Sequence, residues 1–211
     1  MDNYIQTLNA DLAKMEELMR LLLPTPSSYE DILSLYLLYK KHKHTNSIID
    51  YAKAVLQSGE GIDQLLADAK SLKMQVAKCF QLYTDNQGAF DAIDVDSLFK
   101  AHIQPFQDAE KAEADIATPL WKEFQQLSNH LDYIDFNSDK FKQKDAECDA
   151  AKAEYDKHHA KVNELHDAWQ KEVSRCTIAL TFRLEDLSLV FHYMQGIAQS
   201  IIDTITKQEG E

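Results

Sequence analysis

The sequence predicts an all-α fold in which three long, kinked helices form an antiparallel coiled coil. Apolar residues recur in steps of three and four along most of the 211 residues, which is the spacing of a helical seam. The chain has only 5 Gly and 4 Pro, too few for the many tight turns of a sandwich or barrel. The prolines and a few polar stretches mark where the helices break. We therefore expect a single helical domain over residues 1–211.

The first helix carries an apolar seam that ends at two prolines. Pro24 and Pro26 end this helix because proline has no backbone N–H to donate and restricts the residue before it. Ser27 and Ser28 are candidate N-caps for the next helix. The seam consists of Ile5, Leu8, Leu12, Met15, Met19 and Leu22.

The second long helix is interrupted more than once. The segment 40–47 is polar, so it is either a local break or a solvated stretch of helix. Ser58-Gly59-Glu60-Gly61 loosens the helix again, because glycine is a poor helix former. The apolar pattern resumes over 62–83, and Asn86-Gln87-Gly88 is the next expected interruption.

The second half of the chain predicts two further long helices. The first covers about 95–142, and Pro105 and Pro119 inside it should each bend the helix or start a new one. A polar turn is expected over 135–148, followed by a last helix over 149–206. One chain of this length cannot cover both sides of such helices, so the surplus apolar surface predicts a second chain.

The charge of the chain is distributed unevenly. The formal net charge is -13, which excludes nonspecific nucleic-acid binding because that requires a basic surface. Segment 85–139 is strongly acidic, with 12 Asp and Glu against 3 Lys. Segments 40–53 and 140–161 are two patches in which basic residues outnumber acidic ones. No apolar run approaches the ~20 residues that span a bilayer, and the polar start predicts no signal peptide.

No pattern in the sequence predicts catalysis. We find neither a phosphate-binding glycine loop nor a nucleophile elbow. Glu154 and His158 are four apart and share a helix face, but no second such pair appears. Cys79, Cys148 and Cys176 are odd in number and lack a CxxC spacing, which argues against a disulfide framework or a zinc site and for a reducing, intracellular setting. The sequence therefore predicts no enzyme, no catalytic residue, no cofactor and no metal.

Three short phrases, in their order and spacing, carry a resemblance to a known family. They are Leu22-Leu23-Pro24-Thr25-Pro26-Ser27-Ser28, Ile103-Gln104-Pro105-Phe106 and Leu131-Asp132-Tyr133. With the kinked helices around them, the chain resembles the BAR domain of the endophilin-like (N-BAR) branch over almost its whole length. The segment between Pro26 and Leu56 is shorter than in that branch, so the membrane-wedging insert is reduced.

The resemblance implies a crescent-shaped homodimer that senses or remodels curved, anionic membranes. It implies a cytoplasmic protein, peripheral on membranes, that acts in endocytosis and vesicle trafficking together with trafficking proteins. The alternative is a helical dimeric scaffold or adaptor for other proteins that binds little lipid, and the acidic net charge favours it. Equally, the run 40–44 is either a membrane-facing patch or a solvated helix face.

The residues expected in these roles form two sets. The membrane-binding residues are Lys40, Lys41, His42, Lys43, His44, Lys140, Lys142, Lys144 and Lys152. The dimer interface is expected to contain Leu72, Val76, Phe80, Leu98, Ile103, Leu187 and Phe191.

Overall fold

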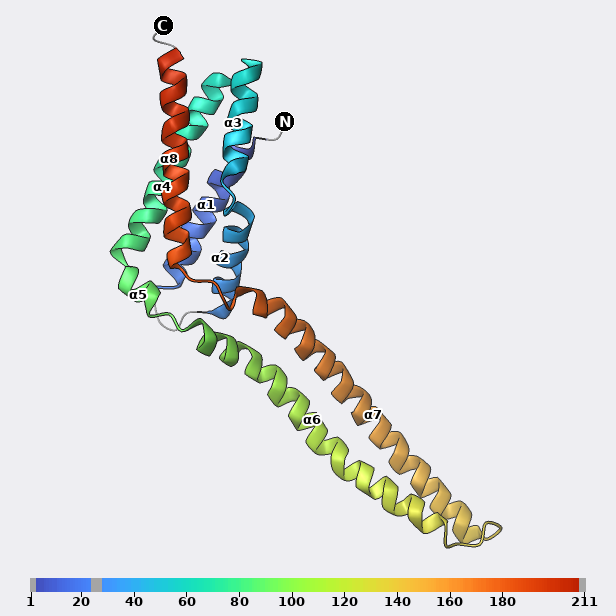
Figure 1. Cartoon of the computed structure of the whole chain (residues 1–211). Helices are drawn as coiled ribbons and strands as arrows, with labels where there is room; N and C mark the ends of the chain where they lie inside the picture. Colours follow the sequence, from blue (N-terminus) through green and yellow to red (C-terminus); the bar gives the residue numbers. More distant parts are fainter. Residues whose placement is uncertain (1–2, 24–27, 209–211) are drawn as a thin grey trace. The chain divides into compact units, whose positions relative to one another are not determined.

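The structure, a computed structural model, describes residues 3–23 and 28–208. Within these residues it contains helices and no strand, which confirms the all-α class. The helices appear in Figure 1 in chain order. They are α1 (Tyr4–Leu21), α2 (Tyr29–His42), α3 (Asn46–Ser58), α4 (Ile62–Asp85), α5 (Gln87–Asp91), α6 (Val95–Leu131), α7 (Asp139–Cys176), the 3-10 turn η1 (Thr177–Ala179) and α8 (Glu185–Gln208).

The chain divides into two compact units where we expected a single domain. The first unit, here called the bundle, combines residues 1–98 with residues 179–211. The second unit, here called the hairpin, covers residues 99–178 and contains most of α6 and α7. Each unit is described by itself.

Helix α1 follows the predicted seam, since all six apolar residues of that seam are buried. The Asn3 side chain caps its start by accepting a hydrogen bond from the Gln6 backbone N–H. At the next helix, Ser28 accepts from the Glu30 backbone N–H, which confirms Ser28 as an N-cap. Pro24, Pro26 and Ser27 lie outside the described residues.

The second long helix is interrupted at the polar run 40–47, which the sequence left open between a break and a solvated helix, and at the two interruptions that the sequence predicted. The polar run contains a true break, because α2 ends at His42 and α3 begins at Asn46. Gly59 and Gly61 then separate α3 from α4 with φ of 74° and 78°. Only glycine adopts this left-handed backbone without strain, so the sequence fixes the break there. Asn86 separates α4 from α5, as expected.

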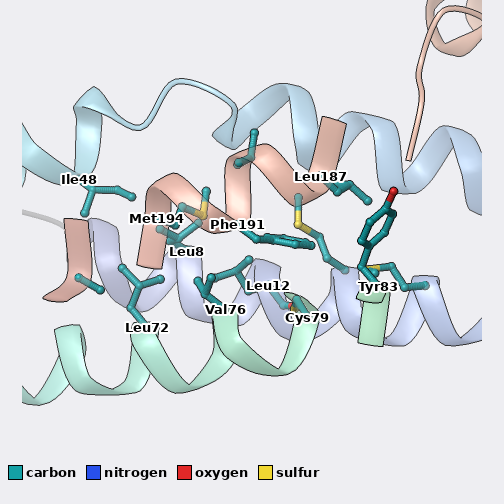
Figure 2. Close-up of a cluster of buried hydrophobic side chains, with 14 of the residues drawn as sticks. Leu8, Leu12, Ile48, Leu72, Val76, Cys79, Tyr83, Leu187, Phe191 and Met194 are labelled. Carbon is teal, nitrogen blue, oxygen red and sulfur yellow. The ribbon is translucent and has the colours of Figure 1, made fainter. Parts of the chain in front are cut away.

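The bundle core lies between α1, α4 and α8 (Figure 2). Helices α4 and α8 are antiparallel, because Lys73 Nζ donates to Gln199 Oε1 at 2.5 Å near the middle of both helices and Tyr83, late in α4, lies close to Glu185 at the start of α8. The labelled side chains of Figure 2 meet in this core: Leu8, Leu12, Ile48, Leu72, Val76, Cys79, Tyr83, Leu187, Phe191 and Met194.

This core corrects the expected dimer interface. Its four central members are wholly enclosed within one chain, so they cannot face a second copy: Leu72, Val76, Leu187 and Phe191. Ile103 is also buried, whereas Phe80 and Leu98 are half-buried against the bundle core. The prediction was wrong for these four core residues because α1, α4 and α8 cover one another's apolar sides within the same chain.

The hairpin is formed by α6 and α7, which run antiparallel (Figure 1). Pro105 and Pro119 do not end α6, which is continuous through both. Both prolines are exposed, as are Ala101 and Asp115, whose carbonyls lose their helical partners and can be hydrated instead. The connecting turn is shorter and earlier than predicted, because α6 already ends at Leu131 and α7 begins at Asp139.

The predicted last helix is in fact two helices, α7 and α8. Between them, the segment 180–184 leaves the helical path and places Phe182 and Leu184 in the bundle core. The Phe182 ring packs on Tyr36 and Tyr39, with centroid distances of 5.5 and 5.2 Å. Burial of this ring outweighs the helical preference of the segment, so the expectation of one helix over 149–206 was wrong.

Candidate functional site

The free end of the hairpin is a compact turn over residues 132–138. The Asp135 side chain accepts a hydrogen bond from the Asn137 backbone N–H at 3.1 Å. Ser138 Oγ donates to the Asp135 carbonyl at 2.6 Å and accepts from the Phe141 backbone N–H at 3.1 Å, which caps α7. These local bonds fix the direction in which the turn presents its other side chains.

Two aromatic side chains project from this turn into solvent. Tyr133 is 90% exposed and Phe136 is 73% exposed, although Phe136 keeps a ring contact with Phe141 at 4.9 Å. Both rings therefore offer apolar surface to the solvent within four residues of each other. The sequence reasoning used Tyr133 only as part of a family phrase. The signal that it missed was two aromatics within a short, polar turn.

Three of the lysines expected to bind membrane lie next to this turn. Lys140, Lys142 and Lys144 lie in the first two turns of α7, and Lys152 is exposed about 12 Å further along the helix axis. Two of them already have carboxylate partners, since Lys142 Nζ is 3.6 Å from Asp139 and Lys144 contacts Glu147.

Acidic side chains share this surface with the lysines. Asp132, Asp135, Asp139 and Asp145 are all exposed around the same turn. The local charge is therefore close to balanced.

The other predicted patch, in the bundle, is only partly exposed. Lys40, Lys43 and His44 are exposed, and Lys41 is exposed but ion-paired to Asp11 at 2.6 Å. His42 is 1% exposed, so the prediction that it faces a membrane was wrong.

His42 instead joins α2 to α1 in a buried hydrogen-bond network. Its Nε2–H donates to Asp11 Oδ2 at 2.7 Å, and its Nδ1 lies 3.2 Å from the Tyr4 hydroxyl, which can donate to it. Burial lowers the pKa of His42, and the hydrogen bond to Asp11 offsets this only in part. Burial would raise the pKa of Asp11, but hydrogen bonds from Lys41 and His42 outweigh it and leave that pKa below its usual value.

Histidine–glutamate pairs join the two helices of the hairpin. His102 Nε2 lies 2.7 Å from Glu172 Oε1, and His166 Nδ1 lies 3.0 Å from Glu110 Oε1. Hydrogen bonds from Arg175, followed by those from His102 and Cys176, outweigh burial and hold the pKa of Glu172 at about 2.

A third pair places His158 between two carboxylates. Its Nδ1 contacts Glu113 of α6, and its Nε2 lies 3.2 Å from Glu154 of α7. Carboxylates only accept hydrogen bonds, so both ring nitrogens can donate at once only in the charged, doubly protonated imidazole. The sequence analysis paired His158 with Glu154 alone, because Glu113 lies 45 residues away along the chain.

Neither protein-family models, nor curated proteins, nor solved structures match this chain. Among the described residues, no helix is both long and apolar enough to cross a membrane. The function is therefore inferred from the residues described above and from the resemblance carried by the sequence.

Proposed function

We propose that this chain is a non-enzymatic, homodimeric module of BAR type that attaches weakly and peripherally to anionic membrane surfaces. The observation that carries the proposal is the exposure of Tyr133 and Phe136 beside Lys140 at the free end of the hairpin. Aromatic side chains favour the membrane–water interface, and lysines next to them favour anionic headgroups. By resemblance, the dimer senses curvature and acts in vesicle trafficking.

The membrane affinity expected for one hairpin is low, so binding requires the two hairpins of a dimer. Burial of one aromatic ring stabilises by about 2 kcal/mol, so two rings contribute about 4 kcal/mol, which corresponds to roughly millimolar affinity. Each lysine near the surface adds about 1 kcal/mol, but Asp132, Asp135 and Asp139 oppose it by a similar amount. A single hairpin would bind too weakly to be useful, whereas two linked hairpins reinforce each other.

The bundle has an exposed apolar surface that can receive the second copy. Leu189 and Tyr193 are four residues apart on α8, hence on one side of the helix, and are 60% and 63% exposed. Phe80 of α4 lines the same groove as Leu189. We propose this surface for the dimer contact, in place of the buried residues expected from the sequence.

Vesicle co-sedimentation tests the membrane contact. The double variant Tyr133→Ser/Phe136→Ser should lose most binding to vesicles rich in anionic lipid, because the rings no longer enter the interface. The control variant Leu37→Ser, at an exposed apolar residue of the bundle, should bind as the unmodified chain does. Equal loss in both variants, or no binding of the unmodified chain to strongly anionic vesicles at low salt, would refute the membrane proposal.

The net charge of -13 favours the second candidate, a helical dimeric scaffold for other proteins. A large negative charge opposes approach to an anionic surface, and only charges within about 8 Å of it act strongly at physiological salt. A chain that dimerises through Leu189 and Tyr193 but never sediments with vesicles would support the scaffold.

A further inference from the structure

Three side chains of different chemistry meet between α6 and α7 in the hairpin. His102 comes from α6, while Glu172 and Cys176 are four residues apart on α7 and so share one side of that helix. The His102 Nε2, Glu172 Oε1 and Cys176 Sγ atoms all lie within 4.8 Å of one another. Glu172 Oε1 is the centre of the group, at 2.7 Å from the histidine nitrogen and 3.3 Å from the sulfur.

We propose that His102, Glu172 and Cys176 bind a Zn²⁺ ion, with water as the fourth ligand. Imidazole, carboxylate and thiolate are the three side-chain groups that zinc takes most often in proteins. Ligand bonds of about 2.0–2.3 Å in a tetrahedron place the ligand atoms roughly 3.3–3.7 Å apart. The carboxylate oxygen is 2.7 Å from the histidine nitrogen and 3.3 Å from the sulfur, and no two ligand atoms are more than 4.8 Å apart, so side-chain shifts of about 1 Å suffice.

The type of ligand and its burial favour zinc over calcium or magnesium. A thiolate is a soft ligand, whereas calcium and magnesium prefer oxygen ligands alone. Cys176 is buried, and the His102 and Glu172 side chains are mostly covered, so an ion here would be largely screened from water. On binding, the cysteine thiol releases its proton to the buffer, and the ion replaces the hydrogen bonds that now converge on Glu172.

Arg175 competes with the ion for the same carboxylate. Its Nε and a terminal nitrogen donate to Glu172 at 3.0 and 2.5 Å, and its side chain is partly exposed. A zinc ion must therefore displace or tolerate this positive charge. Removal of the charge should strengthen zinc binding, whereas a purely structural arginine–glutamate pair would give no such gain.

Cobalt spectroscopy on the whole chain tests the proposal. One equivalent of Co²⁺ should give a thiolate-to-cobalt charge-transfer band, and Zn²⁺ should remove it by competition. Cys176→Ser should abolish this band and weaken zinc binding at least about tenfold. Cys148→Ser, at another buried cysteine of the hairpin, should leave the band and the affinity unchanged.

Arg175→Gln gives a second, independent readout, because it should bind zinc about tenfold more tightly. The matched control is Arg20→Gln, which removes a comparable arginine–glutamate pair of α1 and should change nothing. If far-UV circular dichroism shows that Cys176→Ser does not fold, the zinc affinity of Arg175→Gln decides whether the proposal stands. The proposal is overturned if no band forms, if Cys148→Ser removes it, or if Arg175→Gln binds zinc no more tightly than Arg20→Gln.

Discussion

Replacement of Leu72 by alanine tests whether this residue belongs to the core of one chain or to a dimer interface. The Leu72 side chain is fully enclosed between α1, α4 and α8 of one chain. A buried leucine truncated to alanine costs about 2–5 kcal/mol, the sum of lost burial and of the cavity that remains. Because small domains are stable by only about 5–15 kcal/mol, this change should be large. With a urea dependence of about 2 kcal/mol per M, the midpoint should fall by roughly 1–2.5 M.

The assay is urea unfolding followed by far-UV circular dichroism at two protein concentrations fifty-fold apart. A core residue lowers the midpoint equally at both concentrations. A residue at a dimer interface lowers it more in concentrated protein, where the unmodified chain gains most from dimerisation. Leu37→Ala, at an exposed apolar residue of α2, is the control and should change stability by less than about 0.5 kcal/mol. A midpoint for Leu72→Ala that matches this control, or a loss confined to concentrated protein, would show that our placement of Leu72 is mistaken.

Three further outcomes are expected. Burial lowers the pKa of His42, whereas in the unfolded chain it is about 6.5, so acid protonates the unfolded chain first and favours unfolding. The urea midpoint should therefore decrease as the pH is lowered from about 7.5 to about 5.5. His42→Gln should remove this fall, and the exposed His44→Gln should keep it. Gly59→Ala should destabilise by about 1 kcal/mol because φ is 74°, whereas Gly88→Ala, without positive φ, should not; urea unfolding of both variants checks this. Phe182→Ala should cost about 3–5 kcal/mol and expose the segment 180–184 to proteases, and unchanged proteolysis would contradict its role as the anchor of that segment.

Local features of the fold could be predicted from the sequence because their causes are local. The seam of α1 is set by apolar spacing, the start of α2 by the Ser28 side chain, and the break after α3 by Gly59 and Gly61. Each of these depends on residues within one or two helical turns.

The errors arose where distant segments decide the outcome. The residues near Phe182 do not predict a helix break, because the break depends on Tyr36 and Tyr39 of α2, which pack on the Phe182 ring. The sequence places His42 in a basic patch, but in the structure it is buried and hydrogen-bonded to Asp11 of α1. The partners of the cluster at Glu172 include His102, which is 70 residues away in the sequence, so no local pattern could reveal that they meet.

In the hairpin, the number of residues between two contacting side chains increases with their distance from the turn. Near the turn, Phe136 and Phe141 meet across a few residues, and further along α6 and α7 the pairs Glu113–His158 and Glu110–His166 span 45 and 56 residues. The entropy lost on closing a loop grows with the logarithm of its length, so each contact made near the turn shortens the loop that the next one must close. We expect α6 and α7 to zip together from the turn outward during folding, and pulse-labelled hydrogen exchange would show protection spreading in that order. A hairpin whose assembly starts at its capped turn can form before the residues after α7 have joined the bundle.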